Sequence, residues 1–165
     1  MEIERKWDVA GWPEEALPVL ETYEMEQGYL CTRPTVRIRK EALLGGKTAY
    51  ILCIKGKADA LGLAREEIEL SVSEEEFRRM QAVIGKPLIK KVRRTYLLPD
   101  GAHLEVNEVD AGLPTHFFYA EVEFASREAA LGWIPPTEGL QAYLNKDCTG
   151  QPGSTMAEYW IQTRD

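Results

Sequence analysis

The feature that most constrains this chain is a set of short segments in which charged residues alternate with apolar ones. Glu2-Ile3-Glu4-Arg5-Lys6 opens the sequence in this way, and Arg37-Ile38-Arg39 repeats the pattern with cations. Side chains two positions apart in a β-strand share a face, so each segment predicts a strand with one charged and one apolar face. A chain in which such segments recur is expected to be mainly antiparallel β-structure, which tolerates two unlike faces.

The period-two segments predict about eight strands. They cover residues 2–7, 27–30, 35–39, 48–55, 65–72, 89–97, 102–107 and 117–124. We expect helices over 73–85, 126–133 and 155–163, and we interpret 13–25 as a further helix interrupted by Pro18. Many short strands with tight turns indicate a closed barrel or a sandwich. No internal repeat or linker is evident, so residues 1–165 are expected to form a single domain.

The charged residues of these strands separate into acidic and basic sets. In one strand taken alone, the charges would simply face water. Here the sorting recurs in six strands, which favours a ligand that needs both signs of charge. Carboxylate clusters bind hard divalent cations, and Arg and Lys clusters bind phosphate oxygens. The carboxylates are Glu2, Glu4, Glu67, Glu69, Glu121 and Glu123, and the cations are Lys6, Arg37, Arg39, Lys55, Arg65, Lys91 and Arg93.

Residues 2–6 resemble the ExExK signature of the CYTH superfamily, the triphosphate tunnel metalloenzymes. The later motifs follow in the family's order: Gln27-Gly28-Tyr29-Leu30, Arg37-Ile38-Arg39, Lys55, Arg65-Glu66-Glu67-Ile68-Glu69, Lys91-Val92-Arg93 and Glu121-Val122-Glu123. The resemblance covers roughly residues 1–149 and looks most like the small bacterial branch, in which inorganic triphosphatase activity is common. It implies an all-β-dominated (α+β) fold, a closed eight-stranded antiparallel barrel that forms a tunnel, with a few peripheral helices.

The resemblance also implies roles for the charged residues, with water as the nucleophile. Metal ligands for Mg²⁺ or Mn²⁺ would be Glu2, Glu4, Glu121 and Glu123. Substrate-binding residues would be Arg37, Arg39, Lys55, Arg65, Lys91 and Arg93, and catalytic residues would be Lys6, Glu67 and Glu69. The implied reaction is hydrolysis of inorganic triphosphate to pyrophosphate and phosphate. The alternatives are nucleoside or thiamine triphosphate hydrolysis, adenylate cyclisation, a non-catalytic polyphosphate-binding module, and a structural barrel whose charges face water.

The sequence departs from the family pattern at several positions. Trp7 stands where Phe is common and is expected to face outward. Cys53 stands where Thr is frequent, and Asn107 where Asp is usual, which removes a charge. The segment 151–155 lacks the Tyr and Asn that often follow in the family, so the late wall of the tunnel is expected to differ.

Net charge, apolar runs and cysteine spacing restrict the kinds of partner that the protein is expected to bind. The formal net charge is −7, which argues against a nucleic-acid surface. The thirteen sorted charges sum to +1, however, so an acidic exterior would still be compatible with a tunnel that admits a triphosphate. No apolar run approaches the roughly 18 residues of a membrane helix, and no apolar signal core opens the chain, so we expect a cytoplasmic protein without a membrane partner. Three widely spaced cysteines support neither disulfides nor a zinc site. A homodimer is compatible with a chain of this size.

Overall fold

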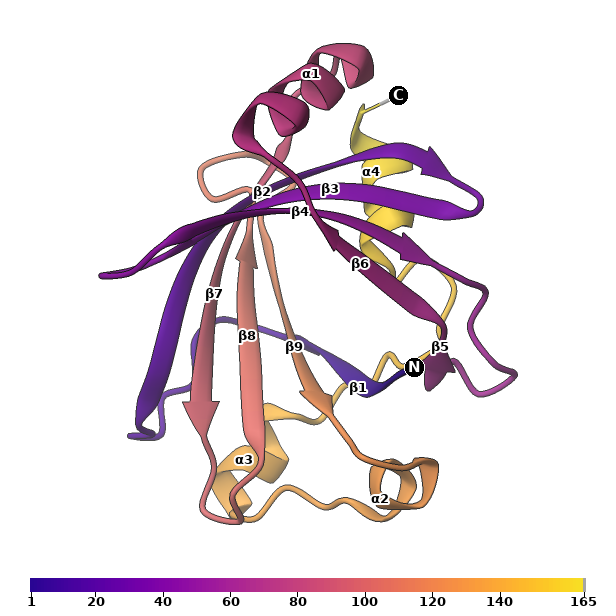
Figure 1. Ribbon diagram of the computed structural model, residues 1–165. Helices are drawn as coiled ribbons and strands as arrows, with labels where there is room; N and C mark the ends of the chain where they lie inside the picture. Colours follow the sequence, from indigo (N-terminus) through magenta and orange to yellow (C-terminus); the bar gives the residue numbers. More distant parts are fainter. Residues whose placement is uncertain (165) are drawn as a thin grey trace.

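The computed structural model describes residues 1–164, which contain nine strands and four short helices (Figure 1). The strands are β1 (Glu2–Val9), β2 (Val19–Thr32), β3 (Thr35–Leu43), β4 (Thr48–Lys55), β5 (Ala64–Arg65), β6 (Glu67–Ser71), β7 (Ile89–Leu97), β8 (His103–Val109) and β9 (Phe117–Glu123). The helices are α1 (Glu74–Ile84), α2 (Arg127–Gly132), α3 (Glu138–Tyr143) and α4 (Met156–Arg164). None of these described helices is long and apolar enough to cross a membrane.

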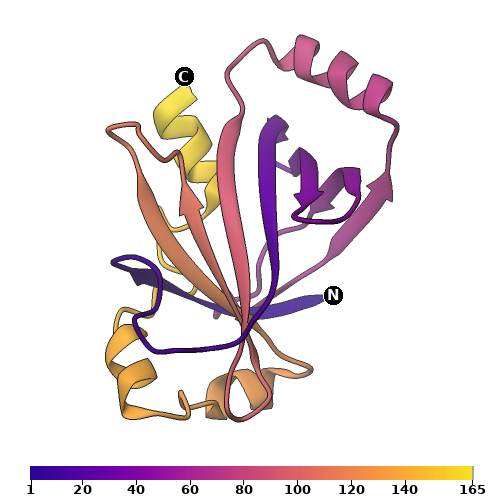
Figure 2. The same cartoon turned by 90° about the vertical axis from the view of Figure 1, so that its left-hand side faces the viewer.

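The strands form one antiparallel sheet that curls into a barrel (Figures 1 and 2). Its order is β5-β1-β9-β8-β7-β2-β3-β4-β6. β5 pairs with β1 and β6 pairs with β4, and only Glu66 separates β5 from β6, so one stretch of chain joins the two ends of the sheet. The closed antiparallel barrel is therefore confirmed. Nine strands are present rather than eight because the continuous strand expected over 65–72 is interrupted at Glu66, whose carbonyl accepts from the Gly56 amide.

Local sequence signals account for most helix boundaries. Ser73 and Glu76 form a capping box at the start of α1, and Gly85 ends the helix in a left-handed conformation, where glycine has no steric penalty. Ser126 caps α2. The closing helix expected over 155–163 is α4, whereas α3, capped by Thr137, was not expected from the sequence.

The helix expected over residues 13–25 is wrong. Residues 19–32 instead form β2, the longest strand, which pairs with β3 on one edge and β7 on the other. Pro18, just before β2, disfavours a continuous helix. Alternate residues Met25, Gln27 and Tyr29 are buried, and both edges of the strand are hydrogen-bonded to neighbours. Pairing on two edges outweighs the weak local helix preference.

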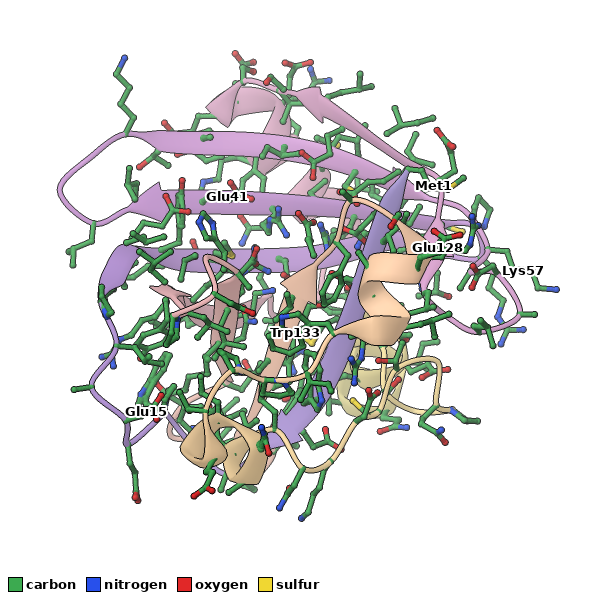
Figure 3. All side chains as sticks on the ribbon, turned by 90° about the horizontal axis from the view of Figure 1, so that it is seen from below. Met1, Glu15, Glu41, Lys57, Glu128 and Trp133 are labelled. Carbon is green, nitrogen blue, oxygen red and sulfur yellow. The ribbon has the colours of Figure 1, made fainter. Side chains whose placement is uncertain are left out.

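Two of the three hydrophobic core clusters lie outside the barrel, between the sheet and the helices. Trp7 is 1% exposed and packs with apolar residues from β8, β9 and α3, so its outward orientation is confirmed. Its ring centroid lies 5.8 Å from that of Trp133, which is labelled beside α2 in Figure 3. A second cluster contains Ile38 and Phe77 under α1. Because the apolar faces are buried outward, the charged faces of the strands are turned into the barrel.

Candidate active site

The barrel encloses a cavity of about 590 Å³. All thirteen charged residues singled out from the sequence line it: Glu2, Glu4, Lys6, Arg37, Arg39, Lys55, Arg65, Glu67, Glu69, Lys91, Arg93, Glu121 and Glu123. A structural barrel whose charged faces all point to water is thereby excluded. Glu105 and Tyr119 also line the cavity but were missed, although each lies two residues from a position considered in the sequence.

Three carboxylates come together at one part of the cavity. Glu4 lies opposite Glu123 in the β1–β9 register. One carboxylate oxygen each of Glu2, Glu4 and Glu123 lies within 4.8 Å of the other two. Burial and the nearby charges of Glu121 and Glu2 raise the pKa of Glu4 well above its ordinary value. Burial also raises the pKa of Glu2 and of Glu123. Crowded carboxylates of this kind fit a hard divalent cation, which would relieve their repulsion.

Glu121 is held differently. It lies opposite Lys6 in the β1–β9 register, and the Arg93 guanidinium is 3.9 Å away. Burial raises the pKa of Glu121, but Lys6, Arg93 and Lys91 lower it further, and the net result is a pKa below the ordinary value. Glu121 therefore stays ionised and links the carboxylate group to the cations.

A mixed cluster lies on β4 and β6. Ligand atoms of Cys53, Glu67 and Glu69 lie within 4.8 Å of one another, and the Cys53 thiol donates to Glu67 over 3.7 Å. Burial raises the pKa of the Cys53 thiol, so it is protonated at neutral pH. Glu67 and Glu69 thus reach the cavity beside a neutral donor, where they can orient water.

Several cavity cations are matched by carboxylates. Arg39 pairs with Glu41 two positions along β3. Lys55 Nζ lies 3.2 Å from a Glu2 oxygen, and Arg93 lies 3.0 Å from Glu105. The neighbouring carboxylates hold these cations at fixed positions and neutralise part of their positive charge.

Four other cations have no such match. Within residues 1–164, no carboxylate oxygen lies within 4.0 Å of the charged nitrogens of Lys6, Arg37, Arg65 or Lys91. Arg37 Nε is buried without a hydrogen-bond partner. Lys91 is 3% exposed, and burial, together with Arg93, Arg39 and Arg37, holds its pKa well below the ordinary value. Arg37 and Lys91 are therefore buried cations with no carboxylate in contact, which is costly, so this part of the cavity is suited to an anion.

Asn107 lies beside Arg93, one of the matched cations. It is fully buried on β8 opposite Arg93, and its Oδ1 accepts from Arg93 Nε over 2.9 Å. Its Nδ2 has no partner within the described residues. The side chain thus orients Arg93 without adding a further negative charge beside it, which an Asp at this position would do.

Comparisons with known proteins agree with this geometry. No family model matches the sequence. The chain is 35% identical over 135 residues to the inorganic triphosphatase of Nitrosomonas europaea. The matched residues make up 82% of this chain and 83% of that protein. A solved structure of an inorganic triphosphatase superposes with a TM-score of 0.62 at 25% identity, over 96% of this chain and 93% of the other.

A protein from Hippeastrum with a dominant triphosphatase activity has the same fold, with a TM-score of 0.56 at 18% identity over 88% of this chain and 89% of its own. A closed antiparallel barrel whose interior combines clustered carboxylates with unmatched cations defines a triphosphate tunnel fold. The chain belongs to the CYTH superfamily, the triphosphate tunnel metalloenzymes.

Proposed function

We propose that this protein is a divalent-metal-dependent triphosphatase that hydrolyses inorganic triphosphate to pyrophosphate and phosphate. The observation that carries the proposal is the shared cavity, in which the carboxylate group of Glu2, Glu4 and Glu123 faces the unmatched cations Arg37 and Lys91. A metal complex of a triphosphate needs both surfaces at once. The name of the Nitrosomonas europaea relative supports inorganic triphosphate as the substrate.

The carboxylate group is the proposed metal site. Glu2, Glu4 and Glu123 would hold Mg²⁺ or Mn²⁺, with Glu121 beside them, because both ions prefer oxygen ligands. When bound, the ion supplies positive charge that stabilises the phosphoryl oxygens during transfer. A distorted or protonated carboxylate would bind the ion less tightly. The raised pKa values of these groups therefore weaken metal binding, and a bound ion would in turn lower the pKa values.

The cations are the proposed substrate-binding residues. Arg37 and Arg39 on β3 and Lys91 on β7 would bind phosphate oxygens. The other substrate-binding residues would be Lys55, Arg65 and Arg93. Because their positions are set by the barrel before the substrate arrives, they can stabilise developing charge without reorganisation.

The nucleophile is proposed to be water. Glu67 and Glu69 would orient it from β6, and Lys6 would assist from β1, where its ammonium donates to the Ser154 carbonyl. A water molecule aligned with the scissile bond makes a covalent intermediate unnecessary.

Phosphate release tests the proposal directly. We expect release from inorganic triphosphate with Mg²⁺ or Mn²⁺, at a higher kcat/KM than from ATP or thiamine triphosphate, and no release when the metal is chelated. Faster release from ATP or thiamine triphosphate would reassign the substrate. Cyclic AMP without free phosphate would make the protein a cyclase, and tight binding of triphosphate without any release would make it a binding module.

Replacing Asn107 by Asp is expected to raise the KM for triphosphate about tenfold, equivalent to about 1.4 kcal/mol. The new carboxylate would sit against Arg93 and neutralise the charge that the phosphate uses. Steady-state kinetics at fixed metal concentration measure the change. Asn145→Asp is the matched control, since it adds the same charge at an exposed position outside the cavity. An equal KM for both variants would mean that a further carboxylate beside Arg93 does not weaken phosphate binding.

A further inference from the structure

Tyr119 occupies a central position in the cavity wall. It lies on β9, is 2% exposed, and contacts two of the four cavity cations that have no carboxylate within 4.0 Å. Lys91 Nζ donates to the Tyr119 hydroxyl over 2.9 Å, and Lys6 Nζ lies 4.2 Å from the centroid of the same ring. One aromatic side chain therefore contacts both lysines: Lys6 through its ring, and Lys91 through its oxygen and also through its ring, whose centroid lies 5.5 Å from Lys91 Nζ.

The ring is held firmly from its other side. Tyr119 belongs to an apolar cluster with Tyr29 and Val109 from the barrel and Met156 and Trp160 from α4. It also stacks on Phe117, with ring centroids 6.0 Å apart and an interplanar angle of 28°. Packing on this scale leaves a side chain few alternative rotamers, so the lysine contacts are made to a fixed support.

This support differs chemically from the carboxylates that hold the other cations. Glu2 and Glu105 orient Lys55 and Arg93 but cancel part of their charge. A phenol has a pKa near 10 and is neutral at pH 7, so it can orient an ammonium group through a hydrogen bond or through its ring without cancelling the charge.

Resting on the proposed function, we infer that Tyr119 is a positioning residue that holds Lys6 and Lys91 against the same triphosphate without cancelling the positive charge of either ammonium group. The hydroxyl acts on Lys91 alone, and the ring acts on Lys6 and, from a longer distance, on Lys91. Substrate affinity should therefore depend on the two parts of this side chain separately.

Two substitutions separate these parts. Tyr119→Phe removes the hydroxyl and keeps the ring, and we expect KM for inorganic triphosphate to rise about fivefold to tenfold while kcat changes by less than about threefold. Tyr119→Leu removes both contacts, and we expect a further rise in KM together with a fall in kcat. Tyr143→Phe is the matched control, because its hydroxyl donates to the Gly11 carbonyl outside the cavity.

A double-mutant cycle tests whether the hydroxyl acts through Lys91. In a Lys91→Met background, Tyr119→Phe should leave KM unchanged within about twofold. An equal penalty with and without Lys91, or a KM for Tyr119→Phe that matches wild type, would overturn the inference. Unfolding midpoints of all variants identify any that act only through stability.

Calorimetric binding of inorganic triphosphate without metal separates this inference from the proposed function. Weaker binding by Tyr119→Phe than by wild type would support the inference even if wild type released no phosphate. Hydrolysis by wild type with unaltered binding in Tyr119→Phe would overturn the inference and leave the proposed function standing. Absence of triphosphate binding by wild type would overturn both.

Discussion

Replacing Glu4 by Gln is expected to lower metal-dependent hydrolysis of triphosphate by about 10² to 10³-fold, because a bound cation contributes several kcal/mol of charge stabilisation. Of the three clustered carboxylates, Glu4 has the most strongly raised pKa, and one of its oxygens lies within 4.8 Å of an oxygen of both Glu2 and Glu123. Gln keeps the shape and one oxygen but removes the negative charge that holds the ion. The other two carboxylates cannot compensate, since both already face the same position.

The measurement has two parts. Phosphate release gives the change in rate, and titration with Mn²⁺ followed by electron paramagnetic resonance gives the change in metal affinity independently of turnover. Glu66→Gln is the matched control, because Glu66 is an exposed carboxylate next to the cavity residue Glu67 but does not line the cavity. Full activity and unchanged Mn²⁺ affinity in Glu4→Gln would place the metal elsewhere.

Replacing Asp110 by Ala is expected to destabilise the protein by about 3–5 kcal/mol, the usual cost of removing one partner of a buried ion pair. Asp110 is 3% exposed and accepts from both terminal nitrogens of Arg164, over 2.8 and 3.2 Å. It also accepts from the Tyr159 hydroxyl and from the Lys90 amide. The pair fastens α4 to the end of the β7–β8 hairpin, and without Asp110 the Arg164 guanidinium is left buried and unmatched.

The same ion pair predicts a pH dependence. Burial raises the pKa of Asp110, but the hydrogen bonds from Arg164, Tyr159 and the Lys90 amide lower it below its ordinary value. A carboxyl group whose pKa is lower in the folded than in the unfolded state stabilises the fold above the unfolded pKa, near 3.9, and loses this contribution as pH falls through the folded pKa.

Urea unfolding at pH 7 and at several values below 4 measures both effects. We expect the difference between wild type and Asp110→Ala to shrink as the pH falls across this window. Asp8→Asn is the control, since Asp8 is exposed on β1. A loss below about 1 kcal/mol at pH 7 would mean that α4 is held by its apolar contacts through Met156 and Trp160 alone.

Helix boundaries and strand positions were the most predictable features of the fold. Ser73 and Gly85 delimit α1 through interactions within a few residues, so a local pattern suffices. Only residues 27–30 of β2 were predicted as a strand, and residues 19–26 were missed because a central strand is stabilised by β3 and β7 rather than by its own residues. The interruption at Glu66 was missed for the same reason, since it depends on where β5 and β6 find separate partners.

The candidate site was predictable as a set of residues but not as an arrangement. Alternation places Arg37 and Arg39 on one face, and Glu2 with Glu4 on another. It cannot show that Arg39 is matched by Glu41 while Arg37 is matched by no carboxylate within residues 1–164. Nor can it show that Tyr119 holds both Lys6 and Lys91, because those contacts join β9 to β7 and β1.

The sequence by itself determined which side chains share a face, because the period of a β-strand is two residues and needs no partner. It also determined the charge content of that face and hence the class of ligand. Only the tertiary structure decided that the charged face is the inner one, because this follows from closure of the sheet through residues 64–71 and from the helices that bury the apolar face outside. Which cations stay unmatched depends on the register between strands, a long-range property that no single strand carries.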